Sequence, residues 1–231
     1  MDKDNNLISI IDNIKHRTFF NEEILNKKRN KKNCLFLDRD GVIIEDCHYL
    51  SNPKDVKIIE GIKDIILHAK KFNWLIVIVT NQSGINRNFF TWNDYESVNR
   101  RMIDMLNIES PFDAIYANGY GPNHAKRTWR KPNPDMLFAA KNDLDIDLSK
   151  SILIGDRLSD LKAGTCAQLK LVVHVKNGHG RIERAEVLRQ VKQNFTEDNQ
   201  IPKNYFCMAE KSVEIMIADK VSNIPLEILE I

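Results

Sequence analysis

From Cys34 onwards, short hydrophobic runs alternate with segments whose apolar residues recur every three or four positions. Several compact runs are rich in β-branched residues and predict buried strands at residues 34–38, 74–80, 113–117, 151–155 and 169–175. The periodic segments predict helices at residues 62–69, 91–102, 133–144 and 158–167. Regular alternation of strand and helix indicates an α/β fold with a parallel central sheet that is covered on both faces.

The two ends of the chain depart from this alternation. Apolar residues between Leu7 and Ile14 fall at helical spacing, so residues 1–33 are expected to be an extension with a short amphipathic helix and a basic linker. The core domain is expected to span residues 34–177. Residues 178–231 allow one helix and carry no motif, so we expect a C-terminal extension that packs against the core or another subunit.

Composition excludes several classes of partner. The chain has 231 residues, 42% of them hydrophobic, and a net charge of +2, which predicts a packed domain without bulk attraction to nucleic acid or membranes. The longest strongly apolar run, Trp74 to Val79, is too short to span a bilayer, and residues 1–14 do not resemble a signal peptide. A cytoplasmic protein with no nucleic-acid or membrane partner is therefore expected.

Two carboxylates, Asp38 and Asp40, directly follow the first predicted strand of the core, and Gly41 then allows the backbone to turn. A short acidic pair in a loop is a weak signal by itself, and a calcium loop is the obvious rival. A calcium loop would place further oxygen ligands soon after the pair. Ile43 and Ile44 stand there instead, which argues against calcium.

Three further polar segments follow predicted strands or precede a helix. Residues 80–84, Thr-Asn-Gln-Ser-Gly, offer hydrogen-bond donors that suit phosphate oxygens, although an ordinary polar turn has the same composition. Lys131 stands beside a helix start, and Asp156 and Asp160 follow an apolar strand. Because the carboxyl ends of parallel strands meet on one side of a sheet, Asp38, Thr80 and Asp156 are expected to converge.

These four segments, in this order, resemble the haloacid dehalogenase-like (HAD) phosphotransferase superfamily over residues 34–175. The resemblance implies a Rossmannoid three-layer α/β/α sandwich, and the short gaps between the motifs leave no room for a large cap domain. It implies an Mg²⁺-dependent phosphatase. The implied catalytic residues are the nucleophile Asp38, the general acid and base Asp40, and the phosphoryl-binding Thr80 and Lys131. The implied metal ligands are Asp38, Asp40 through its backbone carbonyl, and Asp156, with Asp160 in a supporting role.

Local sequences narrow the resemblance to the histidinol-phosphatase and heptose-bisphosphate-phosphatase branch: Asp-Arg-Asp-Gly at 38–41, Thr-Asn-Gln-Ser-Gly-Ile at 80–85 and Arg-Lys-Pro at 130–132. This branch implies removal of the 7-phosphate of a heptose 1,7-bisphosphate, on the route to nucleotide-activated heptose for lipopolysaccharide or capsule. Arg130 is implied to bind the transferred phosphate and Arg157 the second one. The implied substrate-binding residues are Arg39, Asp46, His48, Tyr49, Asn81, Gln82, Ser83, Arg87, Arg130 and Arg157.

The chain departs from this branch in one respect. Many members carry a zinc loop of three cysteines and a histidine before the Arg-Lys pair, but residues 117–129 contain no cysteine and only His124. No zinc is therefore expected. A histidinol-phosphate or broader sugar-phosphate phosphatase fits the same motifs, and a catalytically silent binding module of this fold is the alternative outside enzymes. A phosphatase of nucleic-acid ends is disfavoured by the near-neutral charge.

Overall fold

A computed structural model describes residues 7–13, 15–21, 31–123, 129–194 and 213–230 of the chain. The strands are β1 (Leu7–Asn13), β2 (His16–Asn21), β3 (Cys34–Leu37), β4 (Leu75–Asn81), β5 (Ala114–Asn118), β6 (Ile152–Gly155), β7 (Leu171–Val175) and β8 (Glu214–Ala218). The α-helices are α2 (Ile62–Lys71), α3 (Trp92–Leu106), α4 (Asp135–Leu144), α5 (Leu158–Cys166) and α6 (Gly180–Asn194). Short 3₁₀ turns are η1 (Pro53–Asp55), η2 (Leu148–Lys150), η3 (Val221–Asn223) and η4 (Leu226–Leu229).

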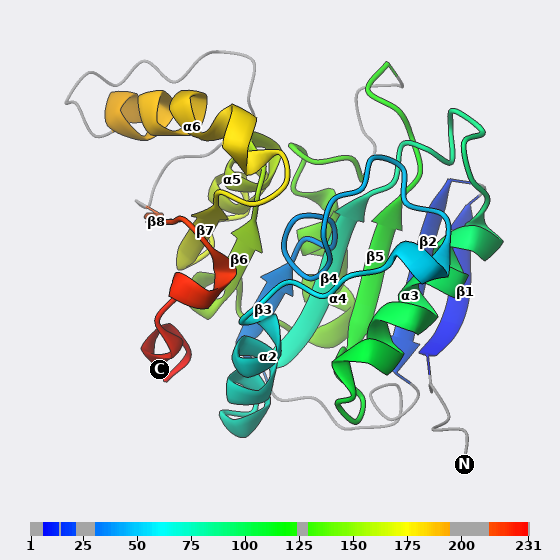
Figure 1. Ribbon diagram of the computed structural model, residues 1–231. Coiled ribbons are helices and arrows are strands. Elements are labelled where there is room, and N and C mark those ends of the chain that lie inside the picture. Colours follow the sequence, from blue (N-terminus) through cyan, green and yellow to red (C-terminus); the bar gives the residue numbers. More distant parts are fainter. Residues whose placement is uncertain (1–6, 14, 22–30, 124–128, 195–212, 231) are drawn as a thin grey trace.

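The eight strands form one sheet in the order β1-β2-β5-β4-β3-β6-β7-β8 (Figure 1). Strands β3 to β8 are parallel to one another. At one edge of the sheet, β2 runs antiparallel to β5 and β1 runs antiparallel to β2. The parallel centre of the predicted sheet is therefore confirmed. Between β3 and β4 the chain forms only η1 and α2, so no cap domain is inserted there.

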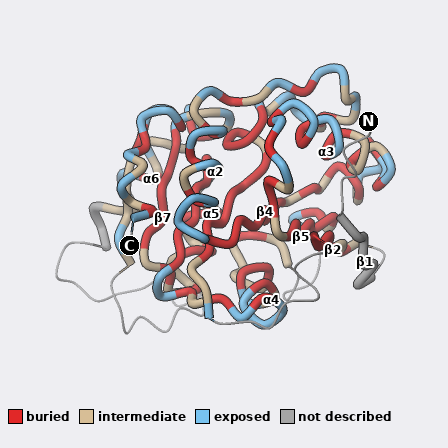
Figure 2. Tube along the Cα trace, turned by 90° about the horizontal axis from the view of Figure 1, so that it is seen from below, coloured by how far each residue is buried: buried red, intermediate tan, exposed pale blue. Residues whose placement is uncertain are grey.

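Alternating side chains of the central strands fill two separate cores. Leu35 and Leu37 of β3 belong to the core under α2 and α3, while Cys34 and Phe36 belong to the core under α4, α5 and α6. Figure 2 shows the strands buried and the outer faces of the helices exposed. The result is the expected three-layer sandwich. In the described ranges, no helix combines the length and the apolarity that crossing a bilayer would require.

Helix α3 begins where its sequence signal stands. Thr91 accepts a hydrogen bond from the backbone N–H of Asp94, and the Asp94 carboxylate accepts one from the backbone N–H of Thr91. Each side chain thus satisfies a donor that a helix N-terminus leaves open. Helix α4 begins one residue later than its predicted cap, because Pro134 rather than Asn133 occupies the N-cap position.

The expected amphipathic helix near the N-terminus is wrong. Residues 7–13 form strand β1, which pairs with β2, and β2 in turn pairs with β5. Helical spacing of apolar residues did not distinguish the two structures, because this segment is rich in isoleucine, whose branched side chain favours strands. Strand β1 is paired with β2, and β2 also with β5. The spacing of apolar residues within one segment does not report such pairing. The predicted linker lies mostly outside the described residues.

The C-terminal segment is part of the main sheet and its core. Strand β8 pairs in parallel with β7 and extends the sheet. Beyond it, Val221, Ile224 and Leu229 are buried in the core that also holds α2. Packing against the core, rather than a free extension, accounts for residues 213–230.

Truncating Leu229 tests this account of the C-terminus. The side chain is fully buried, so Leu229→Ala should lower the free energy of unfolding by about 2–5 kcal/mol, measured by urea denaturation. Leu67→Ala in α2 is the matched control, since Leu67 is 45% exposed. Equal effects of the two substitutions would contradict the packing described here.

Candidate active site

The carboxyl end of the parallel sheet brings the predicted catalytic side chains together. Asp38 follows β3, Thr80 is the last residue but one of β4, and Asp156 follows β6. Lys131 reaches them from the loop that precedes α4. All four are buried, and they come from four separate segments, as the order of strand ends predicts.

Lys131 joins these segments through its ammonium group. Its Nζ lies 3.1 Å from Asp38 Oδ2 and 2.6 Å from Asp160 Oδ1, and donates to the backbone carbonyl of Val79 at 2.8 Å. The Asn81 side chain holds the Lys131 backbone by accepting from its N–H and donating to its carbonyl, both at 3.1 Å. The cation is therefore fixed at both its main chain and its tip.

The electrostatics of the site are dominated by buried negative charge. Burial, reinforced by Asp160 and Asp40 and opposed by Lys131, raises the pKa of Asp38 to about 7. Burial, with Asp38 and Asp160 adding to it, raises the pKa of Asp156 to about 9. Burial alone would lower the pKa of Lys131, but Asp160 and Asp38 raise it above its ordinary value, so the ammonium stays charged.

This cluster has the donor set of a divalent metal site. Carboxylate oxygens of Asp38, Asp156 and Asp160 lie within 4.8 Å of one another. Three carboxylates and the one ammonium of Lys131 leave two negative charges, which a divalent cation would neutralise. Asp156 Oδ1 is buried and has no hydrogen-bond partner among the described residues. Oxygen-only ligands suit Mg²⁺, so these residues fit the expected ion.

The Asp156 carboxylate is closely packed by two glycines. A Cβ at Gly41 would lie 2.4 Å from Asp156 Oδ2, and one at Gly178 would lie 2.5 Å from it. Both glycines have positive φ angles, so any side chain there would be strained as well as obstructed. The carboxylate therefore sits between two loops that approach it closely because they lack side chains.

The Asp40 carboxylate has a separate set of hydrogen-bond partners. Asp40 accepts hydrogen bonds from Arg39 Nε at 3.2 Å and Arg39 Nη2 at 3.0 Å, and from Gln82 Nε2 at 2.8 Å. Gln82 Nε2 also donates to Thr80 Oγ1 at 2.8 Å. A metal contact through the Asp40 carboxylate is thus not part of this arrangement, whereas the predicted backbone contact stays a prediction.

Arg39, a predicted substrate-binding residue, has buried partners besides the pocket that it lines. Its side chain is 1% exposed, donates to Asn99 Oδ1 at 3.0 Å and lies 4.8 Å above the Tyr95 ring. Asn99 and Tyr95 belong to α3. The guanidinium therefore connects α3 to Asp40 and orients that carboxylate. Asn81 and Gln82 likewise direct their amides at Lys131 and Asp40.

A cavity of about 220 Å³ opens beside Asp40, and we call it the substrate pocket. All ten residues predicted to bind substrate line it: Arg39, Asp46, His48, Tyr49, Asn81, Gln82, Ser83, Arg87, Arg130 and Arg157. Burial lowers the pKa of Arg130, and the neighbouring charges of Arg157 and Arg87 lower it further. Arg157 is paired with Glu183 at 3.3 Å, but its charge and that of Arg87 still repel Arg130, so an anion bound beside Arg130 would be stabilised.

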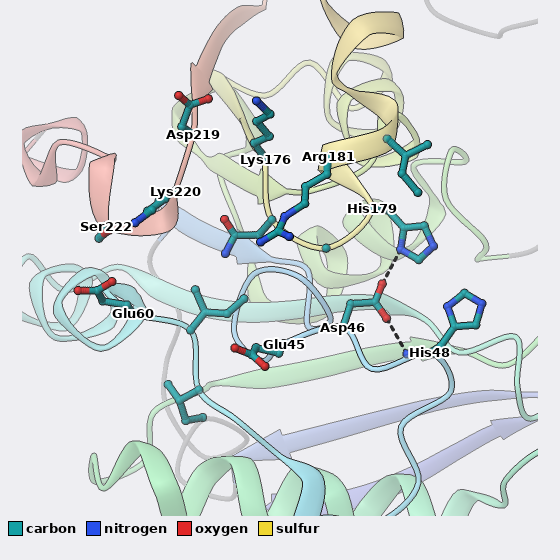
Figure 3. Close-up of a pocket in the computed structure, with 15 residues that line it drawn as sticks. Glu45, Asp46, His48, Glu60, Lys176, His179, Arg181, Asp219, Lys220 and Ser222 are labelled. Carbon is teal, nitrogen blue, oxygen red and sulfur yellow. Dashed lines mark hydrogen bonds and ion pairs between the residues drawn. The ribbon is translucent and has the colours of Figure 1, made fainter.

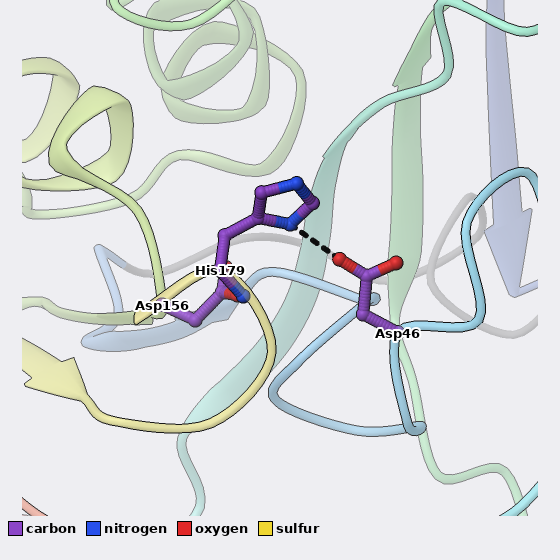
Figure 4. A group of neighbouring side chains, drawn as sticks. All are labelled: Asp46, Asp156 and His179. Carbon is purple, nitrogen blue, oxygen red and sulfur yellow. Dashed lines mark hydrogen bonds and ion pairs between the residues drawn. The ribbon is translucent and has the colours of Figure 1, made fainter. Parts of the chain in front are cut away.

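His179, which follows β7, lines the substrate pocket although no sequence motif marks it. Its Nδ1 lies 2.5 Å from Asp46 Oδ2, and its backbone N–H donates to Asp156 Oδ2 at 2.8 Å. Figure 4 shows the imidazole turned toward Asp46, which comes from the loop after β3. These three residues form the second group of possible metal ligands among the described residues, and neither group contains a cysteine. His124 lies outside the described residues.

The position of His179 in the sequence could have indicated a place at the site. It stands just beyond a strand of the parallel sheet, in the position where ligands of such sheets bind. No motif surrounds it, so the sequence does not single it out among residues 178–231.

The chain is similar to known phosphatases. Residues 128–197 match the HAD-hydrolase-like family. The chain is 37% identical to the D-glycero-α-D-manno-heptose-1,7-bisphosphate 7-phosphatase of Burkholderia mallei over 59% of this chain and 76% of that protein. It is also 37% identical to the D-glycero-β-D-manno-heptose-1,7-bisphosphate 7-phosphatase of Helicobacter pylori, over 61% and 82%.

A solved structure has the same fold. The D,D-heptose 1,7-bisphosphate phosphatase of B. bronchiseptica, complexed with magnesium and phosphate, superposes with a TM-score of 0.65. The superposition covers 82% of this chain and 94% of that one, at 24% sequence identity. At this identity the likeness establishes the fold.

The buried carboxylates predict a pH-dependent stability. A folded-state pKa of about 9 for Asp156, against an ordinary 3.8, means that the folded chain binds more protons between these values. Stability should therefore fall as the pH rises through this window. Thermal melts in chelator should show wild type losing about 1–3 kcal/mol more than Asp156→Asn between pH 6 and pH 9.

Mg²⁺ should raise the melting temperature of wild type at pH 9, and raise that of Asp156→Asn less. Asp104→Asn, which removes an exposed carboxylate of α3, is the matched control and should behave as wild type. Parallel pH profiles for all three proteins would refute the electrostatic account of the cluster.

Proposed function

Because the chain belongs to the family of HAD-like hydrolases that includes the heptose-1,7-bisphosphate 7-phosphatases, we propose that it hydrolyses a phosphate monoester through an aspartyl-phosphate on Asp38. The preferred substrate is D-glycero-D-manno-heptose 1,7-bisphosphate, from which the 7-phosphate is removed. The observation that carries this proposal is the separation of two carboxylates, two residues apart, into different environments: Asp38 contacts Lys131, and Asp40 contacts Arg39.

Asp38 is the nucleophile. One carboxylate oxygen accepts from the Arg39 backbone N–H at 2.7 Å and the other lies 3.1 Å from Lys131 Nζ, so the side chain is held in one orientation. Attack on phosphorus forms the Asp38–phosphate bond and breaks the bond to the sugar oxygen. Lys131 and Thr80 flank the transferring group and stabilise its charge.

Asp40 transfers the proton. Protonated, it donates to the departing sugar oxygen, and as a carboxylate it then accepts a proton from the water that hydrolyses the aspartyl-phosphate. Contacts from Arg39 and Gln82 keep it beside the substrate pocket and away from the metal ligands. Bound Mg²⁺ at Asp38 and Asp156, with the Asp40 carbonyl, would neutralise charge on nucleophile and phosphate, and no zinc is expected.

A bisphosphate suits the charge of the pocket. One phosphate would lie against Asp38 and Lys131, and the second would reach the guanidinium groups of Arg87, Arg130 and Arg157. The two relatives described above are named for opposite anomers of the sugar at the same sequence identity, so the anomer has to be measured. We place the reaction in the cytoplasm, in the synthesis of nucleotide-activated heptose, without nucleic-acid or membrane partners.

A substrate panel tests the proposal. Phosphate release with Mg²⁺ should be fastest from one anomer of heptose 1,7-bisphosphate and at least about tenfold slower from histidinol phosphate, which lacks the second phosphate. Asp38→Asn should lower kcat by about 10³-fold or more. Faster release from histidinol phosphate would replace the proposed substrate, and full activity in excess chelator would refute the metal dependence.

The place of Arg39 behind Asp40 generates a separate prediction. Arg39→Met should lower kcat/KM for a sugar phosphate by about 10- to 100-fold, because the misplaced acid protonates the alkoxide leaving group less well. The loss should be much smaller for p-nitrophenyl phosphate, whose leaving group needs no proton. Arg39→Lys should recover part of the activity. An equal loss with both substrates would show that Arg39 maintains the fold of the site rather than the acid.

A further inference from the structure

A second and larger cavity, of about 1020 Å³, lies next to the substrate pocket, and we call it the side cavity (Figure 3). Asp46, His48 and His179 line both cavities. The Asp46–His179 contact thus forms a wall between them. The proposed chemistry uses the substrate pocket alone and leaves the side cavity without a role.

Three cationic side chains line the side cavity. Lys176 follows β7, Arg181 lies in the first turn of α6 and Lys220 follows β8, so three separate segments supply them. Among the described residues, none of these side chains forms a hydrogen bond or an ion pair. Each is exposed to solvent. Positive charge is therefore available to a ligand here.

The acidic residues of the side cavity are mostly occupied. Glu45 pairs with Lys57 at 3.6 Å, and Asp219 pairs with Arg184 at 3.5 Å. Asp46 is held by His179. Glu60 is the one acidic lining residue without an ion pair among the described residues. Three available cations against one available carboxylate make the cavity attractive to a ligand with two or more negative charges.

Three isoleucines are among the residues that line the side cavity. Ile182, next to Arg181 in α6, is 82% exposed, an unusual state for a large aliphatic side chain. Ile58 and Ile59 also line the cavity. Asn177 and Ser222 add an amide and a hydroxyl that can bond to a polar ring or sugar. Inorganic phosphate would leave this apolar surface uncovered.

We propose that the side cavity binds a second, organic polyphosphate ligand of the nucleoside diphosphate class, distinct from the substrate. Its phosphates would contact Lys176, Arg181 and Lys220, and its ring would cover Ile182. Because the Asp46–His179 wall is shared, a bound ligand would also contact the loop that orients Asp156. The site would thereby connect the binding of this ligand to the substrate pocket.

Calorimetric titration of the full chain provides the test, with ADP, pyrophosphate and adenosine as probes. The Asp38→Asn background prevents turnover and keeps the result independent of the catalytic proposal. Arg181→Glu with Lys220→Glu should weaken ADP binding by about tenfold or more, a loss of about 1.4 kcal/mol. Ile182→Ser should weaken ADP but leave pyrophosphate unchanged, and adenosine alone should bind weakest.

The control keeps the change in net charge but moves it. Lys63→Glu with Lys150→Glu reverses two exposed lysines outside the side cavity and should leave ADP binding intact. With the natural Asp38, the Arg181→Glu and Lys220→Glu protein should hydrolyse p-nitrophenyl phosphate as wild type does. The proposal is overturned if wild type binds neither ADP nor pyrophosphate, or if both charge reversals weaken ADP equally. Loss of ADP binding in Arg130→Ala alone would also overturn it, since the ligand would then occupy the substrate pocket.

Discussion

The contact of Lys131 with Asp38 and Asp160 is the interaction on which the rest of the site depends. Three carboxylates are buried together at the carboxyl end of the sheet, and without a cation their charges could not remain in a site of such low exposure. The Lys131 ammonium offsets one of the three negative charges, so the cluster keeps a net negative charge. This residual negative charge explains why the site suits a divalent cation, which would also offset its repulsion of an anionic substrate.

The fold gives the two neighbouring acids Asp38 and Asp40 different partners. Asp38 and Asp40 are two residues apart, yet one belongs to the cluster around Lys131 and the other to Arg39 and α3. A nucleophile and a proton donor need different positions, and two separate sets of partners hold the two carboxylates apart. This separation requires Arg39 to be buried, where it contacts Tyr95 and Asn99.

Much of this arrangement could be predicted because it depends on strand ends. Apolar runs predict the strands, and parallel topology then brings Asp38, Thr80 and Asp156 together. Such a pattern does not predict the direction of a side chain, so the contacts of Arg39 with Asn99 and Tyr95 of α3 could not be predicted. His179 and strand β8 escaped notice because contacts distant in the sequence, rather than local periodicity, define their places. Strands β1 and β2 depend on pairing in the same way.

The central claim is that phosphate passes through Asp38, and trapping that intermediate tests it most directly. Enzyme in excess over a phosphorylated sugar would be quenched with acid within one turnover and reduced with borohydride, which converts an aspartyl-phosphate to homoserine. Peptide mass spectrometry should then find homoserine at position 38 and an unmodified Asp40. Homoserine at another position, or phosphate release within the first turnover with neither aspartate modified at any quench time, would contradict the account.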